Sequence, residues 1–424
     1  MQPILSKSLL SLSGYTQLST TMQFSGRLVT CVSVMLTIAV LYTVTSISSR
    51  DPTSLFFDPQ KGYALRYSAL RRHEASTFIA AYDQAHPGIV IKAHDDVRKQ
   101  KLCVGIPSTN RDIAGPLSNA VGSLLDGLNT EERQEIYLIV FMPHTDASTH
   151  PAYAQPWLKG LADEVLTYDF GPDRMQFIRN MEQSGRHPAE KRIFDYAYLL
   201  SKCADTYIPY IAVIEEDTLA TDGWYHRTMA ALHEAEQLVA PHPTRTDFLY
   251  LRLFYTEYLL GWNAEYWPTY LWNSIYITIL CAAALLALRF SAPRSKLTSP
   301  RAFALLLPIL AILILFFFAL GRNTVIPMPP GVHAMPNFGC CNQALVYPNH
   351  KIRELVAFLR DRGTGDLHDM LEDYANANGE LRYVVSPSLV QHVGREGPGR
   401  VWSLGFEGWG RGGSRGNGGN GGGG

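Results

Sequence analysis

The sequence has almost no net charge, no paired-cysteine metal motif and no glycosylation signal. Its 37 lysine and arginine residues nearly balance 38 aspartate and glutamate residues, for a net charge of −1. This balance excludes the global basic field of a nucleic-acid-binding protein, so we expect no nucleic acid among its partners. None of the 6 cysteines stands in a CxxC pair, which excludes that zinc-site spacing. An Asn-x-Ser/Thr sequon is absent, and glycosylation therefore gives no clue to the compartment.

Three long stretches, 28–47, 270–288 and 302–320, contain no charged residue. Each approaches the roughly 20 apolar residues that a helix needs to span a bilayer. We expect a signal anchor over the first stretch, with a cleaved signal peptide as the alternative. We expect two further spans over the others, because uninterrupted apolar runs without a polar face favour membrane spans over buried core helices.

The loop between the second and third expected spans, 289–301, carries Arg289, Arg294, Lys296 and Arg301 and no acidic residue. By the positive-inside rule this loop is cytoplasmic. The N-terminal tail is then cytoplasmic as well, and the long segments before and after the two spans share one lumenal compartment. They can therefore form a single domain that a membrane hairpin interrupts.

The pattern along the chain predicts seven parts. The expected α/β domain is divided between two of them, and the last part should be disordered because it lacks the apolar residues that would offset ordering entropy. The parts are a cytoplasmic tail at 1–27, the anchor at 28–47, a lumenal stem at 48–97, the first part of the α/β domain at 98–269, the membrane hairpin at 270–320, the second part of the domain at 321–394, and a Gly-rich tail at 395–424.

Strand-like and helix-like stretches alternate in the lumenal segments. This alternation predicts an α/β fold with a mixed, mostly parallel sheet. Asp222 is expected to cap a helix that runs to Leu238. Strands are expected at 101–106, 135–142, 165–168, 210–214, 248–255 and 382–385, and helices at 67–85, 191–204, 222–238, 351–362 and 366–376.

Four cysteines, Cys103, Cys203, Cys340 and Cys341, lie in the expected lumenal segments. An oxidising compartment would allow them to form disulfides. Four cysteines allow three complete pairings, and the sequence does not choose among them.

Two histidines, His144 and His150, follow the expected strand at 135–142. The loop that holds them is rich in small and polar residues. A histidine pair in such a loop is more often solvated than metal-binding, so we expect both to be exposed to solvent.

The most concentrated chemistry stands at 210–218, YIAVIEEDT, where an apolar β-branched run enters Glu215, Glu216 and Asp217 directly. Ligands of an open α/β sheet sit beyond the carboxyl ends of its strands, and clustered carboxylates there must be solvated or neutralised. Carboxylate oxygens suit Mg²⁺ or Mn²⁺, and such an ion can clamp a diphosphate. A solvated acidic turn before a helix is the alternative.

The order of these features resembles the GPI-glycan N-acetylgalactosamine transferase family. The shared features are an anchor, a divided α/β domain with an acidic triplet, a tandem membrane insertion, GCCNQALVYP at 339–348 and PSLVQHVG at 387–394. The chain looks like a fungal-type member. It is more distantly similar to the N-acetylglucosaminyltransferase IV group, which shares an acidic triplet and a PSL-x-QH-x-G segment. The resemblance covers about residues 98–394, and the chain departs from the family pattern after His392.

The resemblance implies a GT-A-like glycosyltransferase domain and a set of site residues. An inverting displacement also needs a general base, for which Glu257, directly after the strand at 248–255, is the candidate, with an interfacial or helix-start carboxylate as the alternative. The other implied residues are Pro107, Ser108 and Arg111 for the nucleotide, Glu215 and Glu216 for the metal-bound diphosphate, and Asp217 and His392 as metal ligands.

The function implied by the resemblance is a metal-dependent, inverting transferase in the Golgi membrane. It would move a GalNAc-like N-acetylhexosamine from a UDP-sugar to the mannose core of GPI anchors, with Mn²⁺ or Mg²⁺ as the cofactor. Its partners would be the GPI-anchored protein glycan and membrane lipid. The rival is a non-catalytic membrane scaffold or GPI-glycan receptor with a degenerate transferase domain. A transporter is disfavoured because the spans hold no charge for an ion path.

Overall fold

The structure is a computed structural model, and it describes residues 9–62, 66–85, 99–109, 115–184, 188–240, 247–255, 261–291, 300–337 and 342–393. The chain divides into two compact units. We call Met1–Tyr63 with Gly261–Pro327 the helical unit, and Ala64–Leu260 with Met328–Gly424 the sheet unit. Each unit is built from two segments that are far apart in the sequence.

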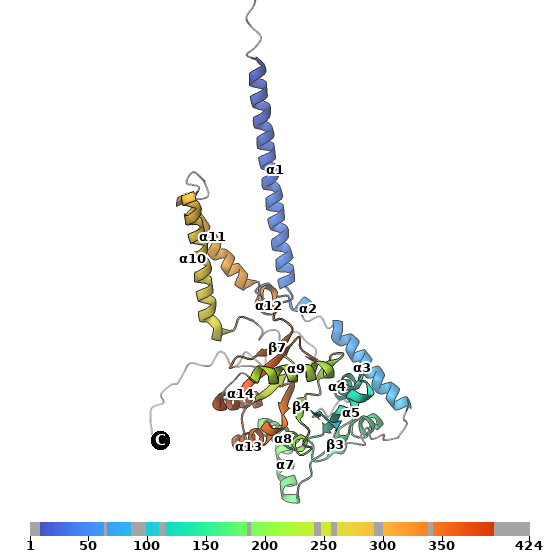
Figure 1. Cartoon of the computed structure of the whole chain (residues 1–424). Coiled ribbons are helices and arrows are strands. Elements are labelled where there is room, and N and C mark those ends of the chain that lie inside the picture. The colour runs from blue at the N-terminus through green and yellow to red at the C-terminus, as the bar shows by residue number, and fades with distance from the viewer. Residues whose placement is uncertain are drawn as a thin grey trace, which may run out of the picture. The chain divides into compact units, whose positions relative to one another are not determined.

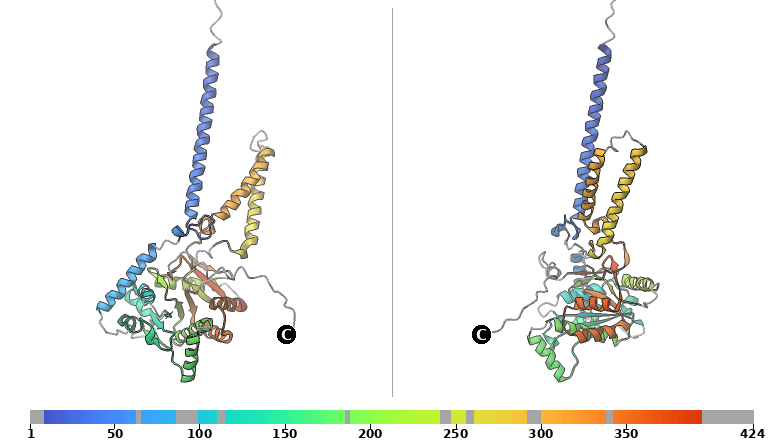
Figure 2. Two further views of the ribbon diagram at one scale, coloured as in Figure 1. Left: turned by 180° about the vertical axis from the view of Figure 1, so that it is seen from behind. Right: turned by 90° about the vertical axis from the view of Figure 1, so that its left-hand side faces the viewer.

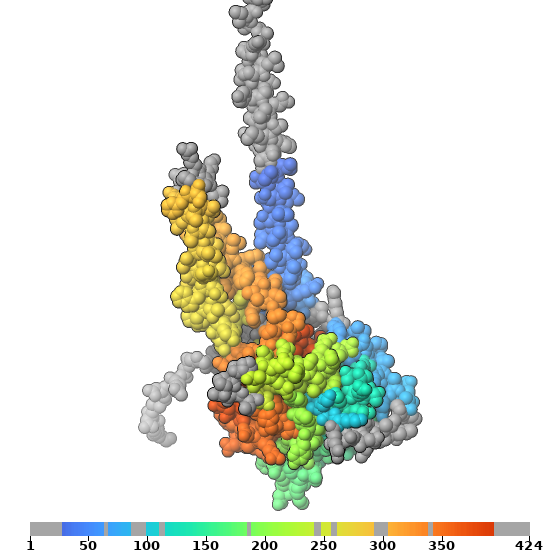
Figure 3. Space-filling view, viewed as in Figure 1, coloured from blue at the N-terminus to red at the C-terminus, as the bar shows by residue number. Residues whose placement is uncertain are grey.

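The helical unit contains long apolar helices (Figure 1). Residues Leu28–Ser48 and Ala264–Ser291 are long and apolar enough to cross a bilayer, with mean hydropathies of 2.1 and 1.9, and neither is buried (Figure 3). These two helices indicate a membrane protein. The third expected span contains a shorter apolar helix, Ala304–Ala319. The elements are α1 Leu9–Ser48, α2 Pro59–Gly62, η4 Ala264–Tyr266, α10 Trp267–Ser291, α11 Pro300–Ala319 and α12 Arg322–Val325.

The sheet unit is built on one mixed sheet of eight strands in the order β3-β2-β1-β4-β8-β6-β9-β7. Four neighbouring pairs are parallel and three are antiparallel, so the expectation of a mixed, mostly parallel α/β sheet is confirmed. The strands are β1 Leu102–Pro107, β2 Ile136–Phe141, β3 Glu164–Leu166, β4 Tyr210–Ile214, β6 Phe248–Arg252, β7 Gly331–Ala334, β8 Ala344–Pro348 and β9 Leu381–Ser386. A separate two-stranded sheet pairs β5 Thr218–Ala220 with β10 Val390–His392.

Helices cover both faces of the main sheet (Figures 1 and 2). The central strands β1, β4 and β8 are continuous apolar runs because both of their faces are buried, as all five residues of β8 show. One face packs against α3 Arg66–Ala85, α4 Gly115–Leu125, α6 Pro156–Leu161 and α9 Trp224–Val239, and the other against α7 Pro172–Ser184, α8 Pro188–Ala204, α13 Ile352–Arg362 and α14 Leu367–Asn378. The remaining short helices are α5 Thr130–Glu135, η2 Ala147–Thr149 and η6 Asn349–Lys351.

The segment 48–97, expected to be a stem, does not form one element. Its first residues belong to the helical unit, where Asp51 Oδ2 accepts hydrogen bonds from Thr324 N at 2.8 Å and Thr324 Oγ1 at 3.1 Å. Helix α3 belongs instead to the sheet unit and packs closely on α4. A Cβ at Gly122 would lie 2.5 Å from the backbone oxygen of Ala75, so glycine is what permits this approach of the two helices.

The start of α9 also differs from the expectation that Asp222 caps it. The residue at the cap is Gly223, with φ of 68°, and it makes no side-chain capping bond. The helix begins with Trp224, whose side chain is 1% exposed and whose Nε1 donates to Leu124 O at 2.8 Å. Burial of this large side chain fixes the start of the helix more strongly than a surface cap worth about 1 kcal/mol.

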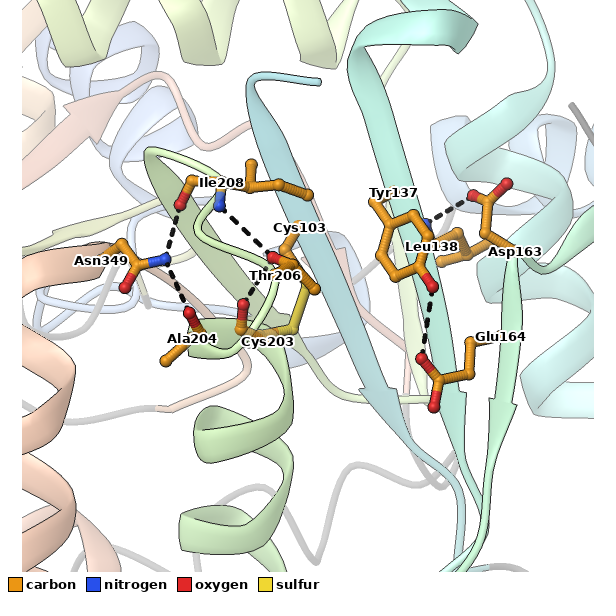
Figure 4. The surroundings of a disulfide bond; sticks show 10 residues. All are labelled: Cys103, Tyr137, Leu138, Asp163, Glu164, Cys203, Ala204, Thr206, Ile208 and Asn349. Carbon is orange, nitrogen blue, oxygen red and sulfur yellow. Dashed lines mark hydrogen bonds between the residues drawn. A yellow bond between two sulfur atoms is a disulfide. The ribbon is translucent and has the colours of Figure 1, made fainter. Parts of the chain in front are cut away.

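A disulfide between Cys103 and Cys203 joins β1 to the last turn of α8 (Figure 4). Asn349, which follows β8, holds the loop after α8, because its Nδ2 donates to Ile208 O at 2.7 Å (Figure 4). The structure thus selects one pair among the expected lumenal cysteines. Cys340 and Cys341 lie outside the described residues, as does the Gly-rich tail at 395–424.

Candidate active site

The carboxyl ends of six strands meet at one edge of the main sheet. Strands β1, β2, β3, β4, β6 and β9 all run in the same direction, since β4 and β6 are each antiparallel to β8 between them. Ser108 follows β1, Glu215 follows β4, and the chain leaves β9 toward β10 and His392. The fold therefore gathers the polar residues singled out in the sequence at the edge where open α/β sheets bind ligands.

The small sheet of β5 and β10 brings His392 to the acidic turn. His392 pairs with Thr218 in the antiparallel ladder, and Val393 N donates to Asp217 O at 2.9 Å. The ladder leaves the imidazole beside the carboxylate, with His392 Nε2 2.9 Å from Asp217 Oδ2. Residues that are 175 positions apart in the chain are thus held in direct contact.

Glu215 completes a cluster with Asp217 and His392. One ligand atom of each residue lies within 4.8 Å of the others, and all three residues are partly buried. Asp217 Oδ1 is a buried oxygen without a hydrogen-bond partner among the residues that the structure describes. A buried oxygen that lacks a donor requires an explanation, and a bound cation supplies one. Two carboxylates and one imidazole are a donor set that fits Mn²⁺.

The cluster shifts the titration of its own members. Burial, and then the neighbouring charge of Asp217, raises the pKa of Glu215 to about 7. Burial alone would lower the pKa of His392, but the hydrogen bond to Asp217 and the charges of Asp217 and Glu215 raise it. Arg192, exposed in the first turns of α8, acts in the opposite direction on Glu215 and lowers its pKa. Carboxylates crowded in this way favour a cationic partner.

The middle acid, Glu216, is not in this cluster. Its Oε2 accepts from Ser108 Oγ at 2.5 Å and its Oε1 accepts from Thr109 N at 3.0 Å. The three adjacent carboxylates therefore divide into two groups. Glu215 and Asp217 lie with His392, whereas Glu216 binds the residues that follow β1.

The histidines after β2 are buried, which corrects the expectation that they are solvated. His150 is 1% exposed and His144 is 5% exposed, with their rings stacked at 6.1 Å. His150 Nε2 lies 2.9 Å from Ser108 Oγ, and its Nδ1 accepts from Ala152 N at 3.1 Å. Burial lowers the pKa of His150, so the ring is neutral near pH 7.

A cavity of about 270 Å³ lies beside these histidines, beyond the end of β2. The described residues that line it include two acids, Asp146 and Glu182, and one base, Arg179. Thr145, in the lining, donates from its N and Oγ1 to Glu182 at 3.0 and 2.6 Å. The lining residues are His144, Thr145, Asp146, Thr149, Arg179, Glu182 and Gln183.

The structure thus brings several of the expected site residues together. Pro107 ends β1, and Ser108 joins the acidic turn through Glu216. Arg111 and Glu257 lie outside the described residues. Sequence reasoning missed Arg192 and the role of His150, because neither stands in a motif; only their positions next to strand and helix ends could have suggested them.

Comparison with known proteins identifies the family. A family model described as "GPI-N-acetylgalactosamine transferase PGAP4" matches residues 123–391. The chain belongs to this family. The match spans the acidic turn, helices α10 and α11, and the second segment of the sheet unit up to the residue before His392.

Among solved structures, the chain is similar to the crystal structure of mouse xyloside xylosyltransferase 1 in its apo form, with 12% sequence identity and a TM-score of 0.31. The similarity covers 68% of this chain and 84% of the other. Family membership indicates that the protein is a glycosyltransferase that acts on GPI glycans.

Proposed function

We propose that the protein transfers an N-acetylhexosamine, GalNAc in its family, from a UDP-sugar to a mannose of the GPI anchor. The observation that carries this proposal is the cluster of Glu215, Asp217 and His392 at the carboxyl edge of the sheet, in a chain of this family. The domain would be GT-A-like, with its catalytic parts on the lumenal side of the Golgi membrane. Strands from both segments of the sheet unit support a domain that the apolar helices interrupt.

Mn²⁺, or Mg²⁺, is the proposed cofactor, held by Asp217 and His392 with Glu215 as the third ligand. When bound, it would neutralise the negative charge that grows on the UDP diphosphate as the sugar leaves. Arg192 is the cation of α8 that acts on the same cluster. We propose that the Arg192 guanidinium makes a second contact with the diphosphate, because a guanidinium pairs well with phosphate oxygens.

The reaction proposed is an inverting displacement. The acceptor mannose hydroxyl attacks the anomeric carbon, the bond to the diphosphate breaks, and a base takes the hydroxyl proton. Glu257, which follows β6 in the sequence, stays the proposed base. Ser108 and Pro107, at the end of β1, and Arg111, three residues after Ser108, stay the proposed nucleotide contacts, whereas the hydrogen bonds of Glu216 favour a supporting role for it.

The membrane is part of the proposal. A GPI glycan lies close to the lumenal leaflet, so an enzyme anchored by its own helices meets the acceptor at a raised effective concentration. The two helices that can cross a bilayer support this arrangement. Three spans with a cytoplasmic N-terminus and a cytoplasmic loop at 289–301 remain the topology that we propose.

The test is UDP release by the full-length chain, purified in detergent with Mn²⁺. UDP-GalNAc, UDP-GlcNAc and UDP-hexoses are compared, each with and without a GPI-glycan acceptor and with EDTA as the control. We expect Mn²⁺-dependent, acceptor-stimulated release from an N-acetylhexosamine donor. Donor binding without turnover would instead support the rival receptor or scaffold. Turnover that survives complete chelation would reject the metal.

A further inference from the structure

The described residues contain a hydrogen-bonded chain that leads from a loop of β2 to the acidic turn of β4. We propose that His150 is a positioning residue which, through Ser108, holds Glu216 and so fixes Glu215 and Asp217 in their geometry toward His392. This inference rests on the proposed function, because it assigns Glu216 to the support of the metal site rather than to the metal.

The first step is the direction of the three acids. Glu216 and Asp217 form the turn between β4 and β5, so the contacts of each side chain, rather than a strand alternation, give its direction. Glu215 and Asp217 both lie in the cluster with His392. Glu216 points to the other side, and each of its two carboxylate oxygens accepts a hydrogen bond, from Ser108 Oγ and from Thr109 N.

The second step is the direction of the protons. His150 Nδ1 accepts from the backbone N–H of Ala152 at 3.1 Å, so the ring proton of the neutral imidazole is on Nε2. Nε2–H therefore donates to Ser108 Oγ at 2.9 Å, and the Ser108 hydroxyl must donate its own proton to Glu216 Oε2 at 2.5 Å. Every link has one donor and one acceptor, and no link can be reversed while the Ala152 bond is kept.

The third step is the rigidity of the chain. Ser108 is 0% exposed and His150 is 1% exposed, so water cannot readily replace either partner. Ser108 N donates to Phe141 O at 2.8 Å, which ties the end of β1 to the end of β2. Glu216 is thus bound to a segment that the main sheet fixes. Glu215 and Asp217 flank Glu216 in the chain, so the same contacts restrain their backbone.

The expected effect is on metal affinity. Loss of groups that orient metal ligands typically weakens metal binding by about 10–100-fold. We therefore expect His150→Phe, which keeps a ring but removes the donor, to raise the Mn²⁺ dissociation constant about tenfold. Ser108→Ala, which removes the middle link with little change in volume, should do the same.

Two further variants sharpen the test. In Glu216→Gln, one oxygen becomes an NH₂ group, which must face either the Ser108 hydroxyl or the Thr109 N–H, and both of those are donors. It should weaken Mn²⁺ binding as well. His150→Gln can place an amide N–H near the position of Nε2 and should restore most of the affinity. Thr228→Val is the control, because Thr228 is a buried residue of α9 whose hydroxyl, among the described residues, donates within that helix to Trp224 O.

Binding is measured on the full-length chain in detergent, from the electron paramagnetic resonance signal of free Mn²⁺ during titration. Hydrogen exchange of the Thr109 amide is measured in parallel, since the bond to Glu216 should protect it. Faster exchange and weaker binding in His150→Phe, Ser108→Ala and Glu216→Gln, with Thr228→Val unchanged, would support the proposal. Wild-type affinity in both Ser108→Ala and Glu216→Gln would overturn it.

Failure of the proposed function can be distinguished from failure of the positioning role of His150. If the wild-type chain binds no Mn²⁺, the metal assignment falls, and the exchange of the Thr109 amide then decides alone whether Glu216 holds this loop. Unchanged exchange in both Ser108→Ala and Glu216→Gln would overturn the positioning role. If His150→Phe does not fold, Ser108→Ala and His150→Gln give the same comparison with smaller changes.

Discussion

Asp217 carries two contrasting oxygens. Its Oδ2 is 2.9 Å from His392 Nε2, whereas its Oδ1 is buried without a hydrogen-bond partner among the described residues. An oxygen held in this state costs free energy until a cation or donor reaches it. The protein therefore maintains at this residue an arrangement that favours ligand binding over stability.

The first prediction is that Asp217→Ala abolishes transfer but not folding. Removing the side chain deletes one proposed metal ligand and also the unpaired oxygen, so the free energy of unfolding should fall little or rise. UDP release and thermal unfolding of the detergent-purified protein measure the two effects. Near-normal turnover at saturating Mn²⁺ would remove Asp217 from the metal site.

The second prediction concerns pH and His392. A protonated imidazole cannot bind a metal, and the Asp217 carboxylate raises the pKa of His392. Protons should therefore compete with Mn²⁺ at a higher pH than for an ordinary histidine of pKa about 6.5. The Mn²⁺ concentration for half-maximal activity should increase as the pH falls from about 8 to about 6. His392→Gln should need more Mn²⁺ throughout and lose most of this dependence. An identical pH dependence in the variant would assign the titration to another group.

The third prediction concerns Glu257, the proposed base. Glu257→Gln keeps the size of the side chain but cannot accept the proton of the acceptor hydroxyl, so kcat should fall by about 100-fold or more. UDP binding should not change, because the base acts on the acceptor rather than on the nucleotide. The measurement is kcat together with the UDP dissociation constant from calorimetry. Parallel losses in both would indicate a structural role.

Sequence reasoning predicted the acidic triplet and His392 as parts of one site, and the structure brings two of the three acids, Glu215 and Asp217, to His392. It did not predict that Glu216 would turn away from Asp217, since adjacent carboxylates look equivalent in a sequence. Sequence reasoning also placed His150 in solvent, because it judged the histidine by the composition of its loop. Burial of His150 is favourable because the fold brings the Ser108 hydroxyl to its ring. Hydrogen-bond partners so distant in sequence carry no local signal.

At the scale of elements, a buried ion cluster joins β6, β9 and α14. Glu372 accepts from Arg252 Nη2 at 2.6 Å and from Arg382 Nη1 at 2.6 Å, and all three side chains are at most 4% exposed. Tyr250 OH also donates to Glu372 at 2.5 Å. One carboxylate thus compensates two buried guanidinium groups.

The fourth prediction is that Glu372→Gln strongly destabilises the protein. Removing one partner of a buried ion pair leaves uncompensated charge, at a cost of about 3–5 kcal/mol. Asp373→Asn is the matched control on the same helix, because Asp373 is 58% exposed and its pairing with Arg362 is 3.7 Å long. Denaturant unfolding followed by tryptophan fluorescence measures the difference. Equal effects of the two substitutions would mean that Glu372 contributes no more than a surface charge.

Local pattern predicted most elements because their periodicity is strong. The apolar run of β4 and the spacing of Ile193, Tyr196 and Leu200 in α8 each appear as expected. The helix expected at 67–85 forms as α3, but the sequence did not predict its packing in the sheet unit, where Arg71 is 2% exposed and donates to Ala220 O. An arginine looks like a surface residue until its distant carbonyl and carboxylate partners are known.

At the scale of the whole molecule, the main sheet cannot form from one segment alone. Strand β8 lies between β4 and β6, and β9 pairs with β6, although β8 and β9 follow the apolar helices in the sequence. The pairing of Val213 with Leu345 spans more than 100 residues. Such long-range pairing slows folding and requires that both segments be in the same compartment.

The last prediction follows from this division. Replacing the proposed hairpin, 270–320, by a flexible Gly/Ser linker keeps the two segments of the sheet unit on one chain, so the sheet and its site should form. UDP-sugar hydrolysis should therefore be preserved. Transfer to a GPI acceptor embedded in a vesicle should fall, because the helices no longer help to hold the site near the leaflet at which the acceptor is concentrated.

The acceptor itself provides the control. The same glycan without its lipid should be used equally well by the wild-type chain and by the linker variant, since neither gains from proximity to a membrane. A loss confined to the embedded acceptor would show that the helices raise its effective concentration. Unchanged transfer to the embedded acceptor would reduce their role to anchoring. Loss of UDP-sugar hydrolysis together with loss of transfer to both acceptors would mean that the helices support the fold of the sheet unit.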